Sequence, residues 1–529
     1  MPGDRRTVKL AIAVGSTPMR KWEQLVITHA TGIEGIDFVG YVHEQDGAQR
    51  ATSFGNMLFH RYVQAAKGSH MLALETKTED AAEPDERMPD DAHPDVMLFL
   101  CGSAPNETQL RTTACWCFQG PDGVSPTTAP PGTREALTDR SITHFQLVDR
   151  SSSISLRTGS FPTHPGLPIL TADHVLEHAA NWPALALNEL VRHGSVHASE
   201  KTVRSSGIPV PGNLYMGLHH LARMLTRTAP SADLHHAADW NIGMLHQPIH
   251  VLLEEEPSMN VRWFPPPSNG KGRMEPFGYR AADGELNVLY RKIDGATGRS
   301  SIARLRPKSD NILKRSRTMM EVEPDHAYPY VVLVKGEPHL LRTVQSEGTT
   351  DLYRVNDAND GLDPVAVLVN VALHSPSLFE HDGRWWLLGT QDPLRDAALF
   401  VYHGPSPTGP FVPHALNPVK CDVRSARPAG TPFVHAGELW RPALDASAPS
   451  HPAIVLNKVT TLSPDDFMEE PGRILEGFAS TAYGRGMRTL CAMGEVTLVD
   501  GLRSPVLSGS KANAKSGKHR KRSKPSSEG

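Results

Sequence analysis

Tyr-Pro-Tyr-Val-Val, which begins residues 328–341 and is followed by Gly-Glu-Pro-His-Leu-Leu, decides the fold of this chain. It combines a proline beside an apolar or aromatic pair, a short turn with glycine, and a bulky apolar run. Similar copies occupy 275–290, 375–388 and 431–440. The copies are spaced by 53, 47 and 56 residues, counted between their leading prolines, Pro276, Pro329, Pro376 and Pro432. A repeat of about 50 residues, each a strand, tight turn and strand, predicts the blades of a β-propeller.

The residues beside these prolines are the first place to look for function. A propeller gathers one inner strand from every blade around a central channel, where polar side chains can converge on one ligand. Glu275, Tyr328 and Ser375 stand directly before the first three prolines. The repeat therefore predicts that these three side chains face one channel.

Bulk properties restrict the class of protein. A chain of 529 residues is too long for one compact core, and its length predicts about two to four domains. A net charge of −4 provides no field that attracts nucleic acid or an anionic membrane. No apolar run reaches the ~18 residues of a transmembrane helix, and the start of the chain does not resemble a cleavable signal. We expect a cytoplasmic protein with no nucleic-acid partner and no transmembrane segment.

The five cysteines do not form a recognisable disulfide or metal pattern. Cys115 and Cys117 are too close in sequence for a zinc knuckle or a thioredoxin-type pair. We expect all five cysteines to be reduced and mostly buried.

The first third of the chain alternates strands and helices. Apolar segments at 8–15, 36–42 and 94–102 are typical of buried strands, and 22–29 reads as a helix. This alternation over residues 7–190 predicts an α/β domain with a mostly parallel sheet. The first strand is followed by one glycine where a dinucleotide-binding fold needs three, so nucleotide binding is not supported.

Four regions follow from these patterns. Residues 1–190 are predicted as the α/β domain, 191–239 as a helical connector, and 240–505 as the propeller. Residues 506–529 are basic and lack large apolar side chains, so we expect a disordered tail. A helix near 57–66 and a solvated acidic insertion at 75–91 complete the prediction.

Several phrases of the propeller region resemble a known family. They are Trp-Asn-Ile-Gly-Met at 240–244, Trp-Phe-Pro-Pro-Pro at 263–267, Glu-Pro-Phe-Gly at 275–278, Asp-Val-Arg-Ser-Ala-Arg-Pro-Ala-Gly at 422–430, and Arg-Pro-Ala-Leu-Asp at 441–445. The region resembles the N-terminal domain of the plant glucosamine inositolphosphorylceramide transferase family and its bacterial relatives. That domain is similar to the five-bladed propeller of glycoside hydrolase family 43. The resemblance implies an all-β five-bladed β-propeller.

The α/β region resembles the formyltransferase-like, Rossmann-type domain that bacterial relatives of this family often carry in front. The resemblance rests on Ala-Cys-Trp-Cys-Phe-Gln-Gly-Pro-Asp at 114–122 and Pro-Gly-Thr-Arg-Glu-Ala-Leu at 131–137. Gln119 stands where such a domain carries the histidine of the formyl-transfer site. The resemblance therefore implies a degenerate domain, since glutamine cannot shuttle a proton.

Glu275 is the first candidate catalytic residue. Hydrolysis of a glycosidic bond needs two carboxyls, and the resemblance places an acid of propeller glycosidases at this position. The equivalent positions hold Tyr328 and Ser375, which leaves a sugar site with an incomplete hydrolytic pair. We interpret Tyr328 and Ser375 as substrate-binding residues. The alternative is that Glu275 only caps or pairs at the start of a strand.

Arginines form the second candidate group. Arg424, Arg427 and Arg441, with Asp445, form a dense polar set, and guanidinium groups hold phosphate or carboxylate through paired hydrogen bonds. We predict that the arginines bind an anionic substrate group and that Asp445 joins Glu275 as a second tentative catalytic residue. Arg488, which stands where relatives carry histidine, is a further substrate-binding candidate. The alternative is a buried structural bridge between arginine and aspartate.

Several aromatic and histidine residues carry weaker signals. Trp385 and Trp386 point to opposite faces of a strand, and we expect both to be buried between blades rather than stacked on a sugar. His246 and His250 are spaced as metal ligands on a helix, but Pro248 breaks that helix, so no metal site is predicted. His326 and His374, near inner strands, are candidates for hydrogen bonds to hydroxyl groups.

Taken together, the sequence and the resemblance indicate a carbohydrate-active or carbohydrate-binding protein of glycan or glycolipid biosynthesis. A sugar, sugar phosphate or nucleotide sugar would occupy the propeller channel. The alternatives are an N-formyltransferase acting on an amino sugar, a family 43-like glycoside hydrolase, and a non-catalytic interaction module. Whether the protein is an enzyme stays open, and a glycosyl or formyl transferase is favoured over a glycosidase. No cofactor is predicted, except formyl-tetrahydrofolate under the formyltransferase alternative.

Overall fold

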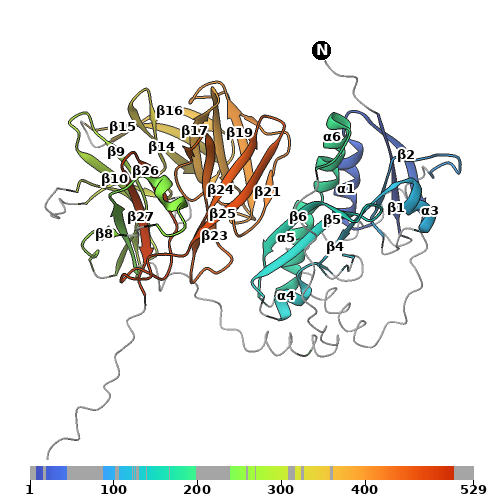
Figure 1. The fold of residues 1–529 in the computed structure, drawn as a ribbon, viewed down its shortest axis with the longest axis horizontal. Helices are drawn as coiled ribbons and strands as arrows, with labels where there is room; N and C mark the ends of the chain where they lie inside the picture. The colour runs from blue at the N-terminus through green and yellow to red at the C-terminus, as the bar shows by residue number, and fades with distance from the viewer. Residues whose placement is uncertain are drawn as a thin grey trace, which may run out of the picture.

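A computed structural model describes the chain at residues 7–15, 19–43, 87–101, 106–121, 123, 125–126, 130–138, 140–165, 167–197, 218, 239–257, 260–268, 270–307, 316–322, 327–357 and 361–504. Most of these residues belong to an α/β domain or to a propeller (Figure 1). The predicted helix near 57–66, the basic tail, His326, and most of the acidic insertion and of the helical connector lie outside the described residues.

The α/β domain is built on a six-stranded sheet of order β2-β1-β3-β4-β5-β6. Its strands are β1 (Val8–Val14), β2 (Ile36–His43), β3 (Val96–Phe99), β4 (Ala114–Gln119), β5 (Ile142–Asp149) and β6 (Ile154–Pro162). The β1 strand pairs in parallel with β2 and β3, and β3 pairs in parallel with β4. The last two strands are antiparallel. The predicted α/β alternation is therefore present, with an antiparallel hairpin at one edge.

Five helices accompany this sheet in the described residues: α1 (Lys21–Thr31), α3 (Glu107–Thr112), α4 (Thr133–Leu137), α5 (Pro168–Ala179) and α6 (Trp182–His193). Helix α1 contacts both α5 and α6, and all three helices contact the sheet. Their apolar faces contribute Trp22, Val175 and Leu187 to the largest core of the domain. A second hydrophobic cluster of the domain includes the buried residues Ala11, Phe99 and Cys115.

The propeller contains five blades, which confirms the repeat and the five-bladed prediction. From the inner to the outer strand, blade 1 comprises β9 (Lys271–Arg280), β10 (Leu286–Asp294), β11 (Ser300–Leu305) and β12 (Arg317–Val322). Blade 2 comprises β13 (Val331–Val334), β14 (Glu337–Val344), β15 (Thr349–Asn356) and β16 (Gly361–Val369). Blade 3 comprises β17 (His374–His381), β18 (Arg384–Thr390), β19 (Ala398–Gly404) and β20 (Val412–Pro413), with β21 (Lys420–Cys421) also paired to β19.

Blade 4 comprises β22 (Phe433–His435), β23 (Glu438–Asp445), β24 (Ala453–Leu462) and β25 (Phe467–Leu475). Blade 5 joins the two ends of the propeller: β26 (Leu490–Met493) and β27 (Val496–Leu502) pair with β7 (Trp240–Leu245) and β8 (Val261–Trp263). A short 3₁₀ helix, η2 (Ile249–Leu253), connects β7 and β8. Since β27 and β7 are hydrogen-bonded neighbours, the ring is closed by non-local pairing.

The turns of the repeated pattern explain its glycines. Two-residue loops connect the inner and second strands of blades 2, 3 and 4, at Lys335-Gly336, Asp382-Gly383 and Ala436-Gly437. Both residues of each loop have positive φ, between 50° and 84°. Turns of this kind match the twist of the flanking strands and favour glycine, which has no Cβ to clash.

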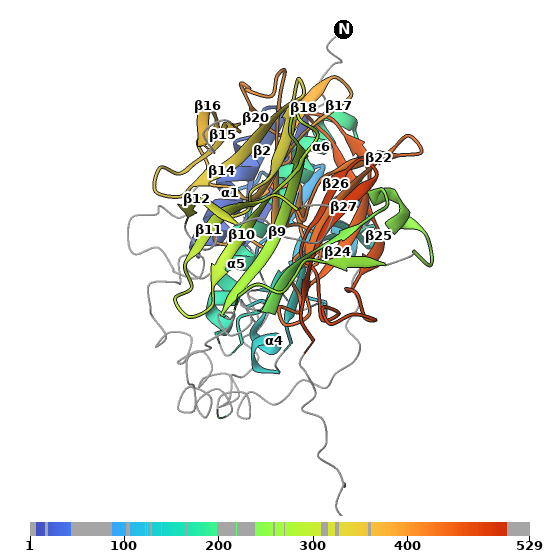
Figure 2. The same ribbon diagram turned by 90° about the vertical axis from the view of Figure 1, so that its left-hand side faces the viewer.

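The two domains share a buried contact. Leu394, Ala397 and Val423 of the propeller belong to the same hydrophobic cluster as the core of the α/β domain. The backbone N–H of Val423 donates to the carbonyl of Ser160 on β6 over 2.8 Å. Figure 2 shows the propeller in front of the α/β domain.

Two bulk predictions can be compared with the structure. All five cysteines are free thiols, and four of them are buried, as predicted. Within the described part of the chain, none of the helices combines the length and the apolar character that crossing a bilayer requires.

Candidate ligand site at the polar mouth of the channel

Two residues before the repeat prolines adopt a rare backbone conformation. Glu275 has φ of 55° and Ser375 has φ of 50°, and both side chains are buried. Residues other than glycine seldom occupy this left-handed region, and the following proline restricts the backbone further. Such strain persists only where surrounding contacts hold it, and it is concentrated at functional sites.

Asp500 on β27 holds Glu275 in this conformation. Its Oδ2 accepts a 2.9 Å hydrogen bond from the backbone N–H of Glu275. Its Oδ1 accepts from the backbone N–H groups of Arg488 and Thr489, over 2.8 and 3.0 Å. Burial, together with the charge of Glu275, raises the pKa of Asp500 to about 6 against the effect of these hydrogen bonds. Asp500 thus connects the entry of blade 1 to the entry of blade 5.

The carboxylate of Glu275 lies between two guanidinium groups. Its oxygens are 3.7 Å from Nη1 of Arg291 and 3.9 Å from Nε of Arg488. These distances are too long for hydrogen bonds. No described side chain donates a hydrogen bond to this buried carboxylate, which is therefore held by charge.

Arg427, in the segment between blades 3 and 4, contacts two residues of blade 3. Its Nε donates to Oγ of Ser375 over 2.8 Å, and its Nη1 donates to Oδ1 of Asp396 over 2.8 Å. Burial alone would raise the pKa of Asp396, but the charge and hydrogen bond of Arg427, assisted by the charge of Arg488, hold it below its usual value. The ionised pair fixes the guanidinium of Arg427 at the channel.

Tyr328 provides the contribution of blade 2. Its ring packs edge-on against Phe277, with ring centroids 4.9 Å apart. Burial raises the pKa of Tyr328 well above its ordinary value, and the nearby Tyr330 and Glu275 add to this shift, while Ser377 and Arg427 oppose it. Tyr328 therefore carries a neutral hydroxyl group beside Glu275 and Arg427.

The structure thus brings together five of the eight predicted site residues. One comes from the entry of each blade: Glu275, Tyr328, Ser375, Arg427 and Arg488. We refer to these five as the polar mouth of the channel. Their binding role stays a prediction.

Other residues of this region were not predicted. Asp396 and Asp392 lie on the loop after β18, and Asp392 Oδ2 lies 3.2 Å from Nε2 of the buried His374. Asp500 and Arg291 come from second strands of their blades. The two acids in Thr-Gln-Asp-Pro-Leu-Arg-Asp, residues 390–396, were the available signal for this loop.

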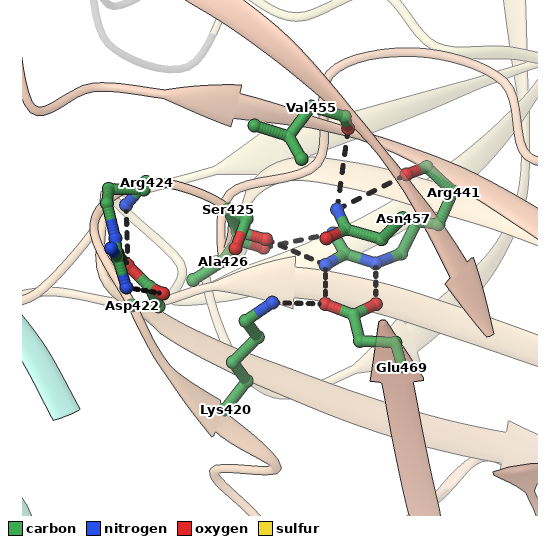
Figure 3. A network of polar contacts seen from close by, with 9 residues as sticks. All are labelled: Lys420, Asp422, Arg424, Ser425, Ala426, Arg441, Val455, Asn457 and Glu469. Atoms are coloured by element: carbon green, nitrogen blue, oxygen red, sulfur yellow. Dashed lines mark hydrogen bonds and ion pairs between the residues drawn. The ribbon is translucent and has the colours of Figure 1, made fainter. Parts of the chain in front are cut away.

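Arg441 lies inside blade 4 (Figure 3). Its Nε and Nη2 donate to the carboxylate of Glu469 over 2.9 and 2.6 Å, and Nη2 and Nη1 donate to the carbonyls of Ser425 and Ala426. Lys420 donates to the same carboxylate over 2.6 Å. The predicted substrate contact is therefore corrected: the guanidinium is fully engaged, and Arg441 is a buried structural bridge.

Arg424 and Asp445 lie toward the α/β domain. Arg424 forms two side-chain hydrogen bonds with Asp422 and one, of 3.3 Å, with Ser160 of β6. The charge of Asp445 contributes to raising the pKa of Arg424, after the effect of Asp422. The described contacts tie both residues to the domain contact and do not link them to Glu275, which corrects their predicted place at the channel.

The weaker candidates have separate places. The ring of His250 stacks on His435, with centroids 4.5 Å apart. Trp386 is buried as predicted, whereas Trp385 is partly exposed and lines a cavity. In the described part of the chain, no three His, Cys, Asp or Glu side chains form a group that could hold a metal ion.

Gln119 is buried at the end of β4, where its Oε1 accepts a 2.9 Å hydrogen bond from Arg150. This hydrogen bond satisfies the buried side-chain oxygen of Gln119, whose amide cannot shuttle a proton. The formyltransferase-like identity of the domain stays a prediction.

Part of the propeller is similar in sequence to a known family. Residues 274–482 match the model of a family described as glucosamine inositolphosphorylceramide transferase 1, N-terminal. The rice protein of this name (Oryza sativa subsp. japonica) is 28% identical over 196 residues, which are 34% of this chain and 26% of the relative. The Arabidopsis thaliana protein is 26% identical over 149 residues, 27% of this chain and 20% of the relative. The chain therefore spans about a quarter of these relatives.

Solved structures similar to this chain include carbohydrate hydrolases. A GH43_1 enzyme from Xanthomonas citri in complex with xylotriose has a TM-score of 0.32 and 11% identity, and covers 41% of this chain and 79% of its own. A family 117 glycoside hydrolase from Zobellia galactanivorans has a TM-score of 0.31 and 14% identity, and covers 45% and 87%.

Proposed function

We propose that the polar mouth binds a sugar bearing an anionic group, such as a sugar phosphate or a nucleotide sugar, in a protein of glycan or glycolipid biosynthesis. One observation carries this proposal: all five blade entries contribute a polar side chain to one place. Two of them, Glu275 and Ser375, do so on strained backbone. Convergent polar groups in a channel are the arrangement by which proteins fix the orientation of small ligands.

The charges of the polar mouth favour an anionic ligand. Arg291 and Arg488 lie beside the carboxylate of Glu275, and Arg427 pairs with Asp396. The three guanidinium groups suit phosphate, which such groups bind through paired, charge-assisted hydrogen bonds. The carboxylate of Glu275 remains available to accept hydrogen bonds from sugar hydroxyl groups.

The matched family supports a carbohydrate ligand. Its name includes a transferase and glucosamine, and the matched residues 274–482 contain Glu275, Ser375 and Arg427. Because the chain spans only about a quarter of the plant relatives, their activity does not extend to it directly.

Binding or transfer is favoured over hydrolysis. A hydrolytic pair requires a second carboxyl group that can reach the substrate. Asp500 contacts Glu275, but it is fully buried and both of its oxygens accept backbone hydrogen bonds. Asp396 is held as an ion by Arg427, which disfavours the protonated form that a general acid needs.

Isothermal titration calorimetry tests this proposal. We expect the protein to bind glucosamine 6-phosphate or UDP-N-acetylglucosamine with one site per chain, more tightly than glucosamine or inorganic phosphate. Arg427→Gln should weaken binding at least tenfold, because it removes a charge-assisted contact. Glu275→Gln should weaken binding of the sugars and leave that of inorganic phosphate unchanged.

Arg354→Gln is the matched control, since Arg354 forms an exposed ion pair with Asp363 in the outer half of blade 2. The Arg354→Gln variant should bind the sugar phosphates with the same affinity as the unmodified protein. Absence of binding at millimolar ligand, or equal weakening by Arg354→Gln and Arg427→Gln, would refute the proposal.

A further inference from the structure

A cavity lies at the other end of the inner strands from the polar mouth. It has a volume of about 820 Å³ and is formed by the last residues of the inner strands β9, β13, β17 and β26. Its wall is mainly apolar and includes Val332, Leu333, Leu378, Phe379, Trp385 and Met493. We refer to this cavity as the apolar chamber. Its volume lies within the range of about 300–1,000 Å³ typical of small-molecule sites.

Two polar side chains in the wall of the chamber, Tyr279 and Cys491, already have partners. The hydroxyl of Tyr279 donates to Asp357 over 2.6 Å. The Sγ of Cys491 accepts a hydrogen bond from the backbone N–H of Gly278, and Thr431 lies close enough to bond to the same thiol. The rest of the wall is mainly apolar, so it favours an apolar ligand over a sugar.

A layer of aromatic rings separates the chamber from the polar mouth. Phe277, Tyr328 and Tyr330 contact one another, with ring centroids between 4.9 and 6.5 Å apart. All three rings are buried, and Tyr330 also lines the chamber. The chamber is therefore a site distinct from the polar mouth.

The rim of the chamber combines exposed apolar and charged side chains. Leu333 is 55% exposed and stands two residues before the hairpin turn of β13. Arg280, Lys335 and Glu380 also line the opening and are exposed, which leaves an excess of one positive charge.

We propose that the apolar chamber binds a single unbranched alkyl chain whose anionic head lies at the rim beside Arg280 and Lys335. A mainly aliphatic and aromatic wall recognises apolar surface rather than a hydrogen-bond pattern. The chain can come from a free fatty acid or from a lipid with an anionic headgroup, since both present the same chemistry.

The probe for this site is 11-(dansylamino)undecanoate, used below its critical micelle concentration and followed by dansyl fluorescence. We expect saturable binding with one site per chain and displacement by hexadecanoate. Hexadecylamine, with a cationic head, should displace the probe at least tenfold less effectively. Displacement by lysophosphatidate but not by hexadecanoate would assign the site to a lipid rather than a free fatty acid.

Two variants locate the probe in the chamber. Leu333→Asp puts a charge at the rim, and Ala492→Trp fills the wall; each should weaken binding at least tenfold. The control is Val367→Asp on the outer strand β16, because Val367 is also 55% exposed. It should bind the probe within twofold of the unmodified protein.

Leu333 is exposed, so Leu333→Asp is informative even where Ala492→Trp does not fold. Absence of saturable binding, or unchanged binding by Leu333→Asp, would overturn the proposal. Binding of sugar phosphates should be unaffected by either variant, so this site and the polar mouth are tested independently.

Discussion

Replacing Glu469 by glutamine should destabilise the propeller strongly. Its carboxylate is buried among Arg441 and Lys420 and accepts three side-chain hydrogen bonds of 2.6 to 2.9 Å (Figure 3). Glu469→Gln keeps the shape of the side chain but removes its charge, which leaves the buried Arg441 and the partly buried Lys420 without this counter-ion. Removal of one partner of a buried ion pair costs about 3–5 kcal/mol.

The pKa of Glu469 provides a second route to the magnitude. Burial would raise this pKa, but Arg441 and Lys420 lower it from 4.5 to about 2. A shift of this size corresponds to about 3 kcal/mol of stabilisation. Because the folded-state pKa is the lower one, this stabilisation is complete above pH ~4.5 and is lost as the pH falls through ~2.

Urea unfolding at pH 7 and pH 3 measures both effects, and hydrogen exchange of β23–β25 peptides reports the local change. We expect Glu469→Gln to lose about 3 kcal/mol at pH 7 and roughly half of that at pH 3. Glu438→Gln is the control, since Glu438 forms a partly exposed pair with Lys458 in the same blade and should cost less than ~1 kcal/mol. A loss below ~1 kcal/mol for Glu469→Gln at pH 7 would refute the reasoning.

Two further predictions concern the channel and a turn. Because burial raises the pKa of Asp500 to about 6, its contribution to stability is present below pH ~4 and is lost as the pH rises through 6; Asp500→Asn should remove this pH dependence from urea midpoints. An unchanged profile would contradict the assignment. Ala436→Asn should raise the unfolding free energy by up to ~1 kcal/mol, since Ala436 has φ of 51° before Gly437 and asparagine tolerates this conformation better. A lower thermal midpoint would contradict that reasoning.

The repeat predicted the blades because each copy contains a local hairpin. The segment 328–341 contains all of β13, the turn at Lys335-Gly336 and most of β14, as its pattern indicates. Blade 5 has no such copy, because its halves come from residues 240–263 and 490–502. The pairing of Thr497 with Leu245 is non-local, and no periodic pattern in the sequence can reveal it.

The same distinction separates the predicted site residues from the missed ones. Glu275, Tyr328 and Ser375 were found because each stands directly before a repeat proline, and the repeat marks the inner strands. Asp396 and Asp500 were missed because they reach the channel from a loop and from a second strand, which the repeat does not mark.

Arg441 illustrates a different limit of the sequence. Its interpretation depended on which carboxylate it would meet, and the partner, Glu469, lies 28 residues away on the outer strand. A sequence pattern identifies arginine as a group that binds anions, but it does not say whether the anion is a ligand or another side chain.

The inner strands themselves explain why the channel has two different ends. On β17, Ser375 belongs to the polar mouth, whereas Leu378 and Glu380 line the apolar chamber. At about 3.3 Å per residue, Ser375 and Glu380 are separated by roughly 16 Å. This length exceeds the reach of one side chain, so a ligand in one end does not contact residues of the other. Any effect of one ligand on the other must pass through the aromatic layer of Phe277, Tyr328 and Tyr330, because Tyr328 faces the polar mouth and Tyr330 lines the chamber.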